Sequence, residues 1–322
     1  MNIKTAIQNY LMSIELSRSA HTARTYKNAM KRFSESLIQQ GYVLEIDSPT
    51  IIKEDSIVAF ARDLKINSAS TEQLYIVAVK GFFEFLIAEN LSSVNLVKLK
   101  LLIRQRTRRP GKRLPQFPAD AISKLIVLLL KQDISSNIEA MEKLRELRDR
   151  AFLITLADTG LRVHEACNLK RGDIDWNEGR AQIIGKGDKE AIVRFSQRSQ
   201  KVIQDYLRFR AELDGASGKP LASLPLFARH DKGSGKKVKP MTPTTGRNIV
   251  TAAVRNYLGE EMVGRITPHS FRHYFVTRIL ISTGNLKLAQ SLARHQNIAV
   301  TQRYAHLSDE ELDKGYWNVF EQ

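Results

Sequence analysis

A strongly basic stretch near residue 100 divides this chain into two parts. The segment KLKLLIRQRTRRPGKR, residues 98–113, carries eight Lys or Arg side chains and no acidic one, with a Pro-Gly pair near its end. Such a run cannot be buried in a core, and Pro and Gly disfavour a continuous helix. We therefore predict an exposed linker, with Pro115 and Pro118 at the entry to a second domain. The expected boundaries are 1–103, 104–118 and 119–322.

The overall charge of the chain indicates an anionic partner. The 322 residues include 50 Lys and Arg against 34 Asp and Glu, a formal net charge of +16, and 43% are apolar. A surface this basic usually meets nucleic acid or an anionic membrane. The longest apolar runs, such as LIVLLL at 125–130, are too short to span a bilayer, and the first residues lack a signal-peptide pattern. We expect a cytoplasmic protein that binds nucleic acid and no membrane.

The basic linker itself is either a solvated hinge or a surface for a polyanion. Its like charges repel one another, so an anionic polymer lying along it is the favoured interpretation. The residues predicted to contact DNA are Arg104, Arg106, Arg108, Arg109, Lys112 and Arg113.

The first hundred residues predict helices only. Residues 19–42 open with a Ser cap, carry Tyr26, Met30, Phe33 and Leu37 at helical spacing, and close on Gly41. A second strong helix is expected within 68–90, and shorter ones at 3–16 and 53–65. The apolar stripe expected for the second helix consists of Leu74, Val77, Phe82, Phe85 and Leu86. Together they predict a compact helical bundle.

The second domain is expected to be mostly helical with a small antiparallel sheet. Helices are predicted at 119–132, 141–159, 197–213 and from 243 onward. The strands are DIDW and two β-prone runs of AQIIGKGDKEAIVRF, which flank a Gly-Lys-Gly-Asp turn. Cys167 is the single cysteine, which excludes intramolecular disulfides and cysteine-rich zinc sites, and its short helix predicts an inward-facing structural thiol.

One helix start in the second domain is suited to an anion. In TPHSFRHYFVT, Thr267 is a good N-cap and Pro268 suits the first helical position, so His269 lies in the opening turn with Arg272 on the same face. Free N–H groups at a helix start attract phosphate. This pair is weak evidence by itself, because a histidine there is more often a cap or a packed ring.

Further polar residues follow in a fixed order along this domain. Arg162 comes just after a glycine that ends a long apolar helix, and Lys186 stands at the tip of the predicted hairpin. His295 and Tyr304 follow the His-x-x-Arg pair near the end of the chain.

This ordered set resembles the tyrosine recombinases, the phage-integrase and Xer-type family of DNA strand-exchange enzymes. The resemblance covers nearly the whole chain, including the TARTY helix of the first domain. It implies a SAM-like, all-α core-binding bundle and a catalytic domain of the DNA breaking-rejoining fold. It also implies the catalytic set Arg162, Lys186, His269, Arg272, His295 and Tyr304.

The residue types suit cleavage of a phosphodiester without a metal or other cofactor. A tyrosine can store the bond energy as a phosphotyrosyl ester, which assigns Tyr304 as the nucleophile. Two guanidiniums, Arg162 and Arg272, can hold the non-bridging oxygens. His295 then adds a hydrogen bond, and His269 accepts or orients the phenol proton. By resemblance, Lys186 protonates the leaving 5′-oxygen.

Simpler interpretations of single residues stay open. Arg162 pairs with Glu165 one turn on, either as its whole role or to orient the guanidinium. Lys186 alone is an ordinary turn residue, and Tyr304 alone is an ordinary core aromatic. The sequence LARH also departs from the family pattern, because Arg294 stands where many relatives have glycine before the second histidine. His164 stands where relatives often have serine.

Three functions compete. The favoured one is a site-specific recombinase that transfers strands between two double-stranded DNA sites through a covalent 3′-phosphotyrosyl intermediate, for integration, excision or resolution. The resemblance implies a homo-tetramer on two duplexes, with a C-terminal helix that docks on its own or a neighbouring protomer. The alternatives are a non-catalytic DNA-binding protein and a relaxing topoisomerase.

Overall fold

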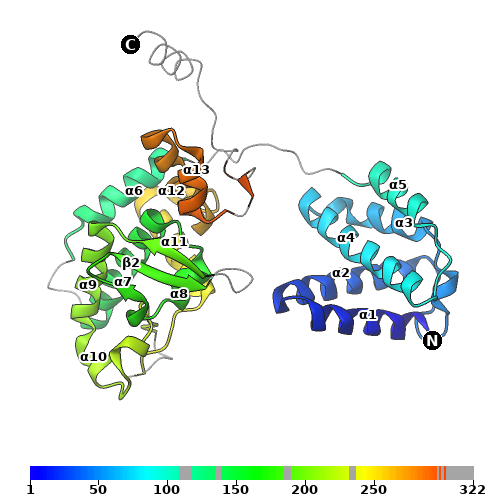
Figure 1. Ribbon diagram of the computed structural model, residues 1–322, viewed down its shortest axis with the longest axis horizontal. Coiled ribbons are helices and arrows are strands. Elements are labelled where there is room, and N and C mark those ends of the chain that lie inside the picture. Colours follow the sequence, from blue (N-terminus) through cyan, green and yellow to red (C-terminus); the bar gives the residue numbers. More distant parts are fainter. Residues whose placement is uncertain are drawn as a thin grey trace, which may run out of the picture. The chain divides into compact units, whose positions relative to one another are not determined.

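The computed structural model describes residues 1–108, 118–134, 139–184, 190–231, 237–295, 297–298 and 301. The chain divides into two compact units, Met1–Arg113 and Leu114–Gln322, and each is described by itself (Figure 1). Within the described residues, none of the helices combines the length and the apolarity that a bilayer crossing requires.

The described residues of the first unit form helices, as the sequence predicts. Most of these helices begin at a polar side chain that accepts a backbone N–H: Asn2, Ser19, Ser68 and Asn95 cap α1, α2, α4 and α5 respectively. The helices are α1 Ile3–Ser17, α2 Ala20–Gln39, α3 Asp55–Asp63, α4 Ala69–Ala88 and α5 Leu96–Arg106. Short 3-10 turns lie at Pro49–Ile51 and Leu64–Ile66.

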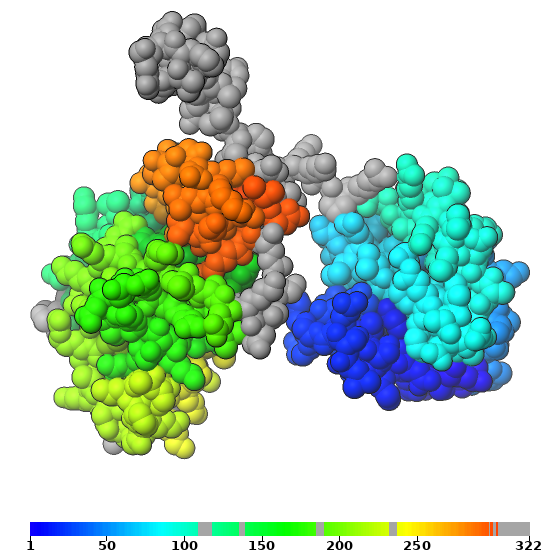
Figure 2. Space-filling model, in the orientation of Figure 1, coloured from blue at the N-terminus to red at the C-terminus, as the bar shows by residue number. Residues whose placement is uncertain are grey.

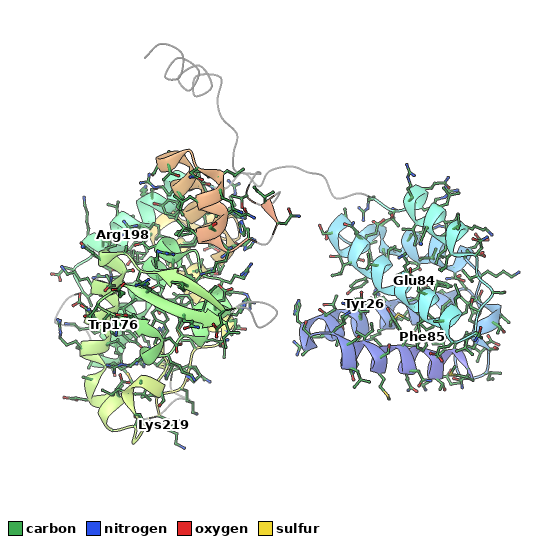
Figure 3. All side chains as sticks on the ribbon, in the orientation of Figure 1. Tyr26, Glu84, Phe85, Trp176, Arg198 and Lys219 are labelled. Atoms are coloured by element: carbon green, nitrogen blue, oxygen red, sulfur yellow. The ribbon has the colours of Figure 1, made fainter. Side chains whose placement is uncertain are left out.

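An aromatic cluster forms the centre of the first unit. Phe33 of α2 meets Phe60 of α3 edge-on at 5.2 Å between ring centroids, and Phe82 and Phe83 of α4 complete the contact. Tyr10 of α1 packs beside them and donates its hydroxyl to the carbonyl of Ala78 at 2.9 Å. Figure 2 shows the close-packed surface of this unit in blue to cyan, and Figure 3 labels Tyr26 and Phe85, two other aromatic neighbours of Tyr10.

Two expectations for the first unit were partly wrong. Of the expected stripe of α4, Phe82 and Leu86 are fully buried and Phe85 packs against the core, but Leu74 and Val77 are about half exposed. Ile76, Val79 and Phe83 are buried as well, because α4 is apolar over most of its circumference and periodicity alone does not select the inward face. The basic run is also helical up to Arg106 in α5, where Leu99 is fully buried, since the Pro-Gly pair lies beyond the helix end.

The second unit contains helices and one small sheet. Its described helices are α6 Ala119–Lys131, α7 Ala140–Thr159, α8 Val163–Asn168, α9 Gln197–Phe209, α10 Ala211–Gly215, α11 Pro243–Leu258, α12 Pro268–Thr283 and α13 Leu286–Ala293. The strands are β1 Ile174–Asp175, β2 Arg180–Ile184 and β3 Glu190–Arg194, in the order β1-β2-β3 and antiparallel. Short 3-10 turns lie at Arg171–Asp173, Leu221–Ser223 and Glu260–Met262.

The sheet forms from the β-prone runs predicted from the sequence, and its residues alternate between buried and exposed. Ala181 pairs with Val193 across β2 and β3, and both are buried together with Ile183, whereas their neighbours along the strands are exposed. Trp176, labelled in Figure 3, packs at the margin of the same core. Cys167 is fully buried in α8, which confirms the predicted structural thiol, and burial raises its pKa to about 12.

Helix α7 is the central element that positions the site. It packs against α9 and α12, and its second half is buried on every side from Ala151 to Ala157. It ends at Gly160, which adopts φ +59°. A Cβ there would lie 2.4 Å from Phe275 of α12, so both the left-handed backbone and the close approach require glycine. Arg162 follows two residues later.

Candidate active site

Arg272 of α12 is the most buried of the predicted site residues, with 3% of its surface exposed. Its guanidinium donates to the carbonyl oxygens of Gly160 and Ala293, at the C-terminal ends of α7 and α13. Helix C-termini attract cations, so these two ends fix the guanidinium in place. Burial, followed by the charges of Arg162 and Arg294, lowers the pKa of Arg272 to about 9.

Arg162 is held by Glu165, as one of the simpler interpretations expects. The guanidinium Nη1 donates to Glu165 Oε1 at 2.8 Å, and the Arg162 backbone N–H donates to Glu165 Oε2 at 2.9 Å. Burial alone would raise the pKa of Glu165, but the hydrogen bonds from Arg162 and the charge of Arg294 hold it below its usual range. The Arg162 side chain is still 36% exposed, so it is oriented without being covered.

The structure brings Arg162, His269 and Arg272 together on one cavity of about 430 Å³. His164 and Arg247 also line it, and no motif in the sequence indicated Arg247, which lies in the second turn of α11. Burial, then the charges of Arg272 and Arg162, lowers the pKa of His269. This histidine is therefore neutral near pH 7 and able to accept a proton.

His295 follows directly after α13 and lies in the same electrostatic environment. Its Nδ1 is 2.9 Å from the hydroxyl of Thr301, and its backbone N–H donates to Gln290. Burial and the charges of Arg272 and Arg162 lower its pKa to about 4. His273, which the sequence analysis did not select, has its ring centroid 4.7 Å from that of His269, and burial lowers its pKa to about 4.

The other predicted residues divide into three groups. The first lies outside the described residues and consists of Lys186, Tyr304, Arg109, Lys112 and Arg113. The second, Arg104 and Arg106, is exposed in the last turn of α5, and the third is Arg108.

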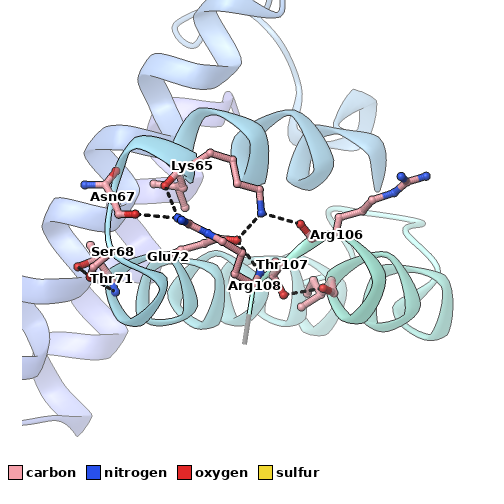
Figure 4. A network of polar contacts seen from close by, with 10 residues as sticks. Lys65, Asn67, Ser68, Thr71, Glu72, Arg106, Thr107 and Arg108 are labelled. Carbon is pink, nitrogen blue, oxygen red and sulfur yellow. Dashed lines mark hydrogen bonds and ion pairs between the residues drawn. The ribbon is translucent and has the colours of Figure 1, made fainter. Parts of the chain in front are cut away.

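Arg108 has internal partners in the first unit. Its Nε donates to the buried carboxylate of Glu72 at 2.6 Å, and its Nη2 donates to the carbonyl of Asn67 at 2.7 Å. Lys65 donates to the same carboxylate at 2.9 Å (Figure 4). The basic composition of the linker gave no sign that one of its arginines is anchored in this way.

Comparisons with known proteins agree with this geometry. A family model described as "Phage integrase family" matches residues 128–311, and "Phage integrase, N-terminal SAM-like domain" matches residues 7–90. Proteins named tyrosine recombinase XerC are similar over almost the whole length. The one from Staphylococcus epidermidis is 27% identical over 310 residues, 96% of this chain and 94% of the relative. The one from Staphylococcus aureus is 28% identical over 319 residues, 99% and 96% respectively.

Solved structures share the fold. The XerH site-specific recombinase bound to difH substrate aligns with a TM-score of 0.67 at 19% identity, over 91% of this chain and 78% of that one. A lambda integrase dimer bound to a COC′ core site aligns with a TM-score of 0.62 at 17% identity, over 95% and 96%. The two-unit, mostly helical architecture with a small antiparallel sheet is therefore that of recombinase structures. Because the catalytic family model spans more than half of the chain, this chain belongs to the phage integrase family and is a site-specific tyrosine recombinase.

Proposed function

We propose that this recombinase cleaves a DNA strand at a phosphate held between Arg162 and Arg272, with Tyr304 as the nucleophile. The observation that supports this best is the cavity that Arg162, His269 and Arg272 line together, although they come from two segments more than a hundred residues apart. Arg162 and Arg272 carry two positive charges into it, against the single carboxylate of Glu165 beside it. A phosphodiester is an anion of the size and charge that such a site binds.

Stabilisation of the transition state follows from how the guanidiniums are fixed. Arg272 is held by backbone carbonyls and Arg162 by Glu165 before any DNA binds. Donors that are already oriented need no reorganisation when negative charge develops on the non-bridging oxygens. Burial lowers the pKa of Arg272 to about 9, and the positive charges of Arg162 and Arg294 add to this shift. A bound phosphate would offset these positive charges.

The proposed reaction exchanges one P–O bond for another. The phenol oxygen of Tyr304 attacks the phosphorus as His269 accepts the phenol proton, which forms the 3′-phosphotyrosyl ester. The bond from phosphorus to the 5′-oxygen breaks, and that oxygen takes a proton from Lys186. Rejoining reverses each step. The arginines supply the positive charge, so the step requires no metal ion.

His295 adds a directed hydrogen bond in this proposal. Its low pKa makes the ring neutral, with a proton on one nitrogen only. If the Thr301 hydroxyl donates to Nδ1, with which it is in contact at 2.9 Å, the proton is on Nε2. Nε2 is then a donor for a phosphate oxygen, and Thr301 fixes the tautomer.

The partner in this proposal is double-stranded DNA carrying two recombination sites, in the cytoplasm. The net charge of +16 and the exposed Arg104 and Arg106 support an interface with the phosphate backbone, continued by Arg109, Lys112 and Arg113. We extend the proposal to a homo-tetramer on two duplexes, in which the expected C-terminal helix docks on its own or on a neighbouring protomer. The structurally similar XerH is bound to difH substrate and the lambda integrase dimer to a COC′ core site, which supports a DNA partner.

A suicide substrate tests the cleavage chemistry. A duplex nicked near the target phosphate loses its leaving fragment on cleavage, so a covalent protein–DNA adduct should accumulate and resist SDS. Tyr304→Phe should form no adduct but bind the same DNA with unchanged affinity, because only the nucleophilic oxygen is lost.

Two results would contradict the proposal. Tight binding with no adduct from the wild-type chain indicates a DNA-binding role without catalysis. An adduct that persists in Tyr304→Phe assigns the nucleophile elsewhere. Strand exchange between two labelled duplexes then distinguishes a recombinase from an enzyme that relaxes supercoils.

A further inference from the structure

Arg294 occupies a backbone conformation that normally selects glycine. It is the C-cap of α13 with φ 57° and ψ 41°, and Asn90 is the only other non-glycine residue with positive φ among the described residues. The left-handed conformation costs most side chains about 1 kcal/mol relative to glycine, and arginine gains nothing from it locally. The position therefore holds arginine for a reason that lies in the side chain.

The side chain of Arg294 reaches the candidate active site. Its Nη2 donates to Glu165 Oε2 at 3.0 Å, and its side chain is only 12% exposed. The same carboxylate binds Arg162 through Oε1. Glu165 thus bridges two arginines that are more than a hundred positions apart in the sequence. The Nη1 atom of Arg294 is buried without a hydrogen-bond partner, so this guanidinium is not satisfied by the protein alone.

The charges around Glu165 explain what Arg294 contributes. Arg162, Arg272 and Arg294 carry three positive charges against the carboxylate of Glu165, a net charge of +2 for these four groups, and Arg247 adds a further positive charge at the cavity. Without Arg294 the net charge of this group falls to +1, and Arg162 alone is paired with the negative charge of Glu165. A carboxylate and a phosphate then compete for the same guanidinium.

A purely structural role for Arg294 is weaker on two counts. Helix α13 is already closed by the backbone N–H of Arg294, which bonds to Gln290 and Ser291, and this bond needs no side chain. A buried guanidinium with an unpaired nitrogen is also a poor way to stabilise a fold.

Resting on the proposed cleavage function, we infer that Arg294 is a positioning residue for that reaction. It balances the negative charge of Glu165 through Oε2, so that Glu165 orients Arg162 without competing with the phosphate for it. The strained backbone is retained because only a long cationic side chain at this position reaches Glu165. Asparagine here keeps the left-handed backbone and removes the charge.

The test is a double-mutant cycle between Arg294 and Glu165. Arg294→Asn should lower the single-turnover cleavage rate at saturating suicide substrate by about 10-fold to 100-fold, the scale seen when a residue that orients a functional side chain is lost. Arg294→Lys, which keeps the charge, should recover part of the rate. In a Glu165→Gln background, Arg294→Asn should cost much less, because no negative charge is left to neutralise.

Folding and binding are measured for each variant. Arg294→Asn should melt at the wild-type temperature or above, and DNA affinity should change less than the cleavage rate. Lys219→Asn removes one exposed positive charge from the same unit and should cleave at the wild-type rate.

Two outcomes would overturn the inference and leave the proposed cleavage function intact. Either Arg294→Asn cleaves at the wild-type rate, or this change lowers the rate equally in the wild-type and Glu165→Gln backgrounds. A wild-type chain that forms no adduct refutes the cleavage function itself, and this role with it.

Discussion

Glu72 in the first unit and Glu165 in the second are both buried carboxylates with basic partners, and the two clusters around them are built differently. In the first unit, Glu72 is fully buried and accepts hydrogen bonds from Lys65 and from both the backbone and the side chain of Arg108. Burial alone would raise its pKa, but these bonds hold it below the usual range. Both cations are about 40% exposed and remain in contact with water.

In the second unit the balance favours the cations. Glu165 is shared by Arg162 and Arg294, and burial, followed by the charges of these two arginines, lowers the pKa of Arg272. Arg294 is 12% exposed and Arg272 is 3% exposed. The first cluster is satisfied within the protein, and it anchors the start of the linker. The second cluster has more buried positive than negative charge and lies beside a cavity, and this arrangement suits the binding of an anion.

The largest expected effect tests this contrast directly. Arg162→Ala or Arg272→Ala should lower the cleavage rate by about 100-fold or more, the scale for losing one charge-stabilising donor. Arg108→Ala should leave the rate at saturating DNA unchanged, because its guanidinium belongs to the other cluster. Single-turnover adduct formation measures both. Equal losses in DNA affinity and in cleavage rate would count against a role of Arg162 and Arg272 in stabilising the transition state.

The next effect concerns stability of the first unit. Glu72→Gln should lower its free energy of unfolding by about 2–3 kcal/mol, since it removes a fully buried charge from two ion pairs. Hydrogen exchange of the amides in α3 to α5 measures this. Glu45→Gln, which removes a single exposed pair with Lys4, is the matched control and should change little. A loss in both variants alike would mean that burial of the carboxylate is irrelevant.

Acidification should lower the free energy of unfolding of the second unit more than that of the first. Burial, with the charges of Arg148 and Arg210, lowers the pKa of His230 to about 3, and its side chain is almost fully buried against Tyr206. An unfolded histidine binds a proton below about pH 6.5, while the folded state does not until about pH 3. Stability is therefore present above pH 6.5 and declines as pH falls, by about 2 kcal/mol from this residue between pH 7 and pH 5.

Tryptophan fluorescence reports this transition selectively, because both tryptophans, Trp176 and Trp317, belong to the second unit. Urea midpoints at pH 7 and pH 5 give the shift. The first unit has the single, exposed histidine His21, so its amide protection should change less. A second unit equally stable at both pH values would rule out the neutral, buried His230.

The smallest effect distinguishes exposed from anchored arginines at the linker. Replacing Arg104 and Arg106 together by Gln should reduce the slope of log K against log salt by about 2, if each contacts one phosphate. Arg108→Gln should change the slope less, because the side chain of Arg108 is hydrogen-bonded to Glu72 and Asn67. Electrophoretic shifts at several salt concentrations measure the slopes. An unchanged slope in the double variant would remove this end of α5 from the DNA interface.

Much of the local structure could be predicted from the sequence, because it depends on neighbours in the chain. Ser19 caps its helix as expected, and the two β-prone runs form the antiparallel pair β2 and β3. The prediction of the buried face failed in part for α4, because several faces of this helix are apolar. The prediction of an exposed linker failed for α5, because the charges of the segment were given more weight than its helix propensity. Burial of Leu99 against the bundle overrides the charge of the surrounding residues.

The sequence by itself determined the order of the elements, the caps and the residue types that the chemistry needs, since these are set within a few residues of each position. The tertiary structure alone decided which arginines share which carboxylate. Arg294 meets Glu165 across 129 positions, and Arg108 meets Glu72 across 36. Formal charge is a property of the composition, whereas an anion site depends on where that charge is left unbalanced, and only the packing of α7, α8, α12 and α13 brings those groups together.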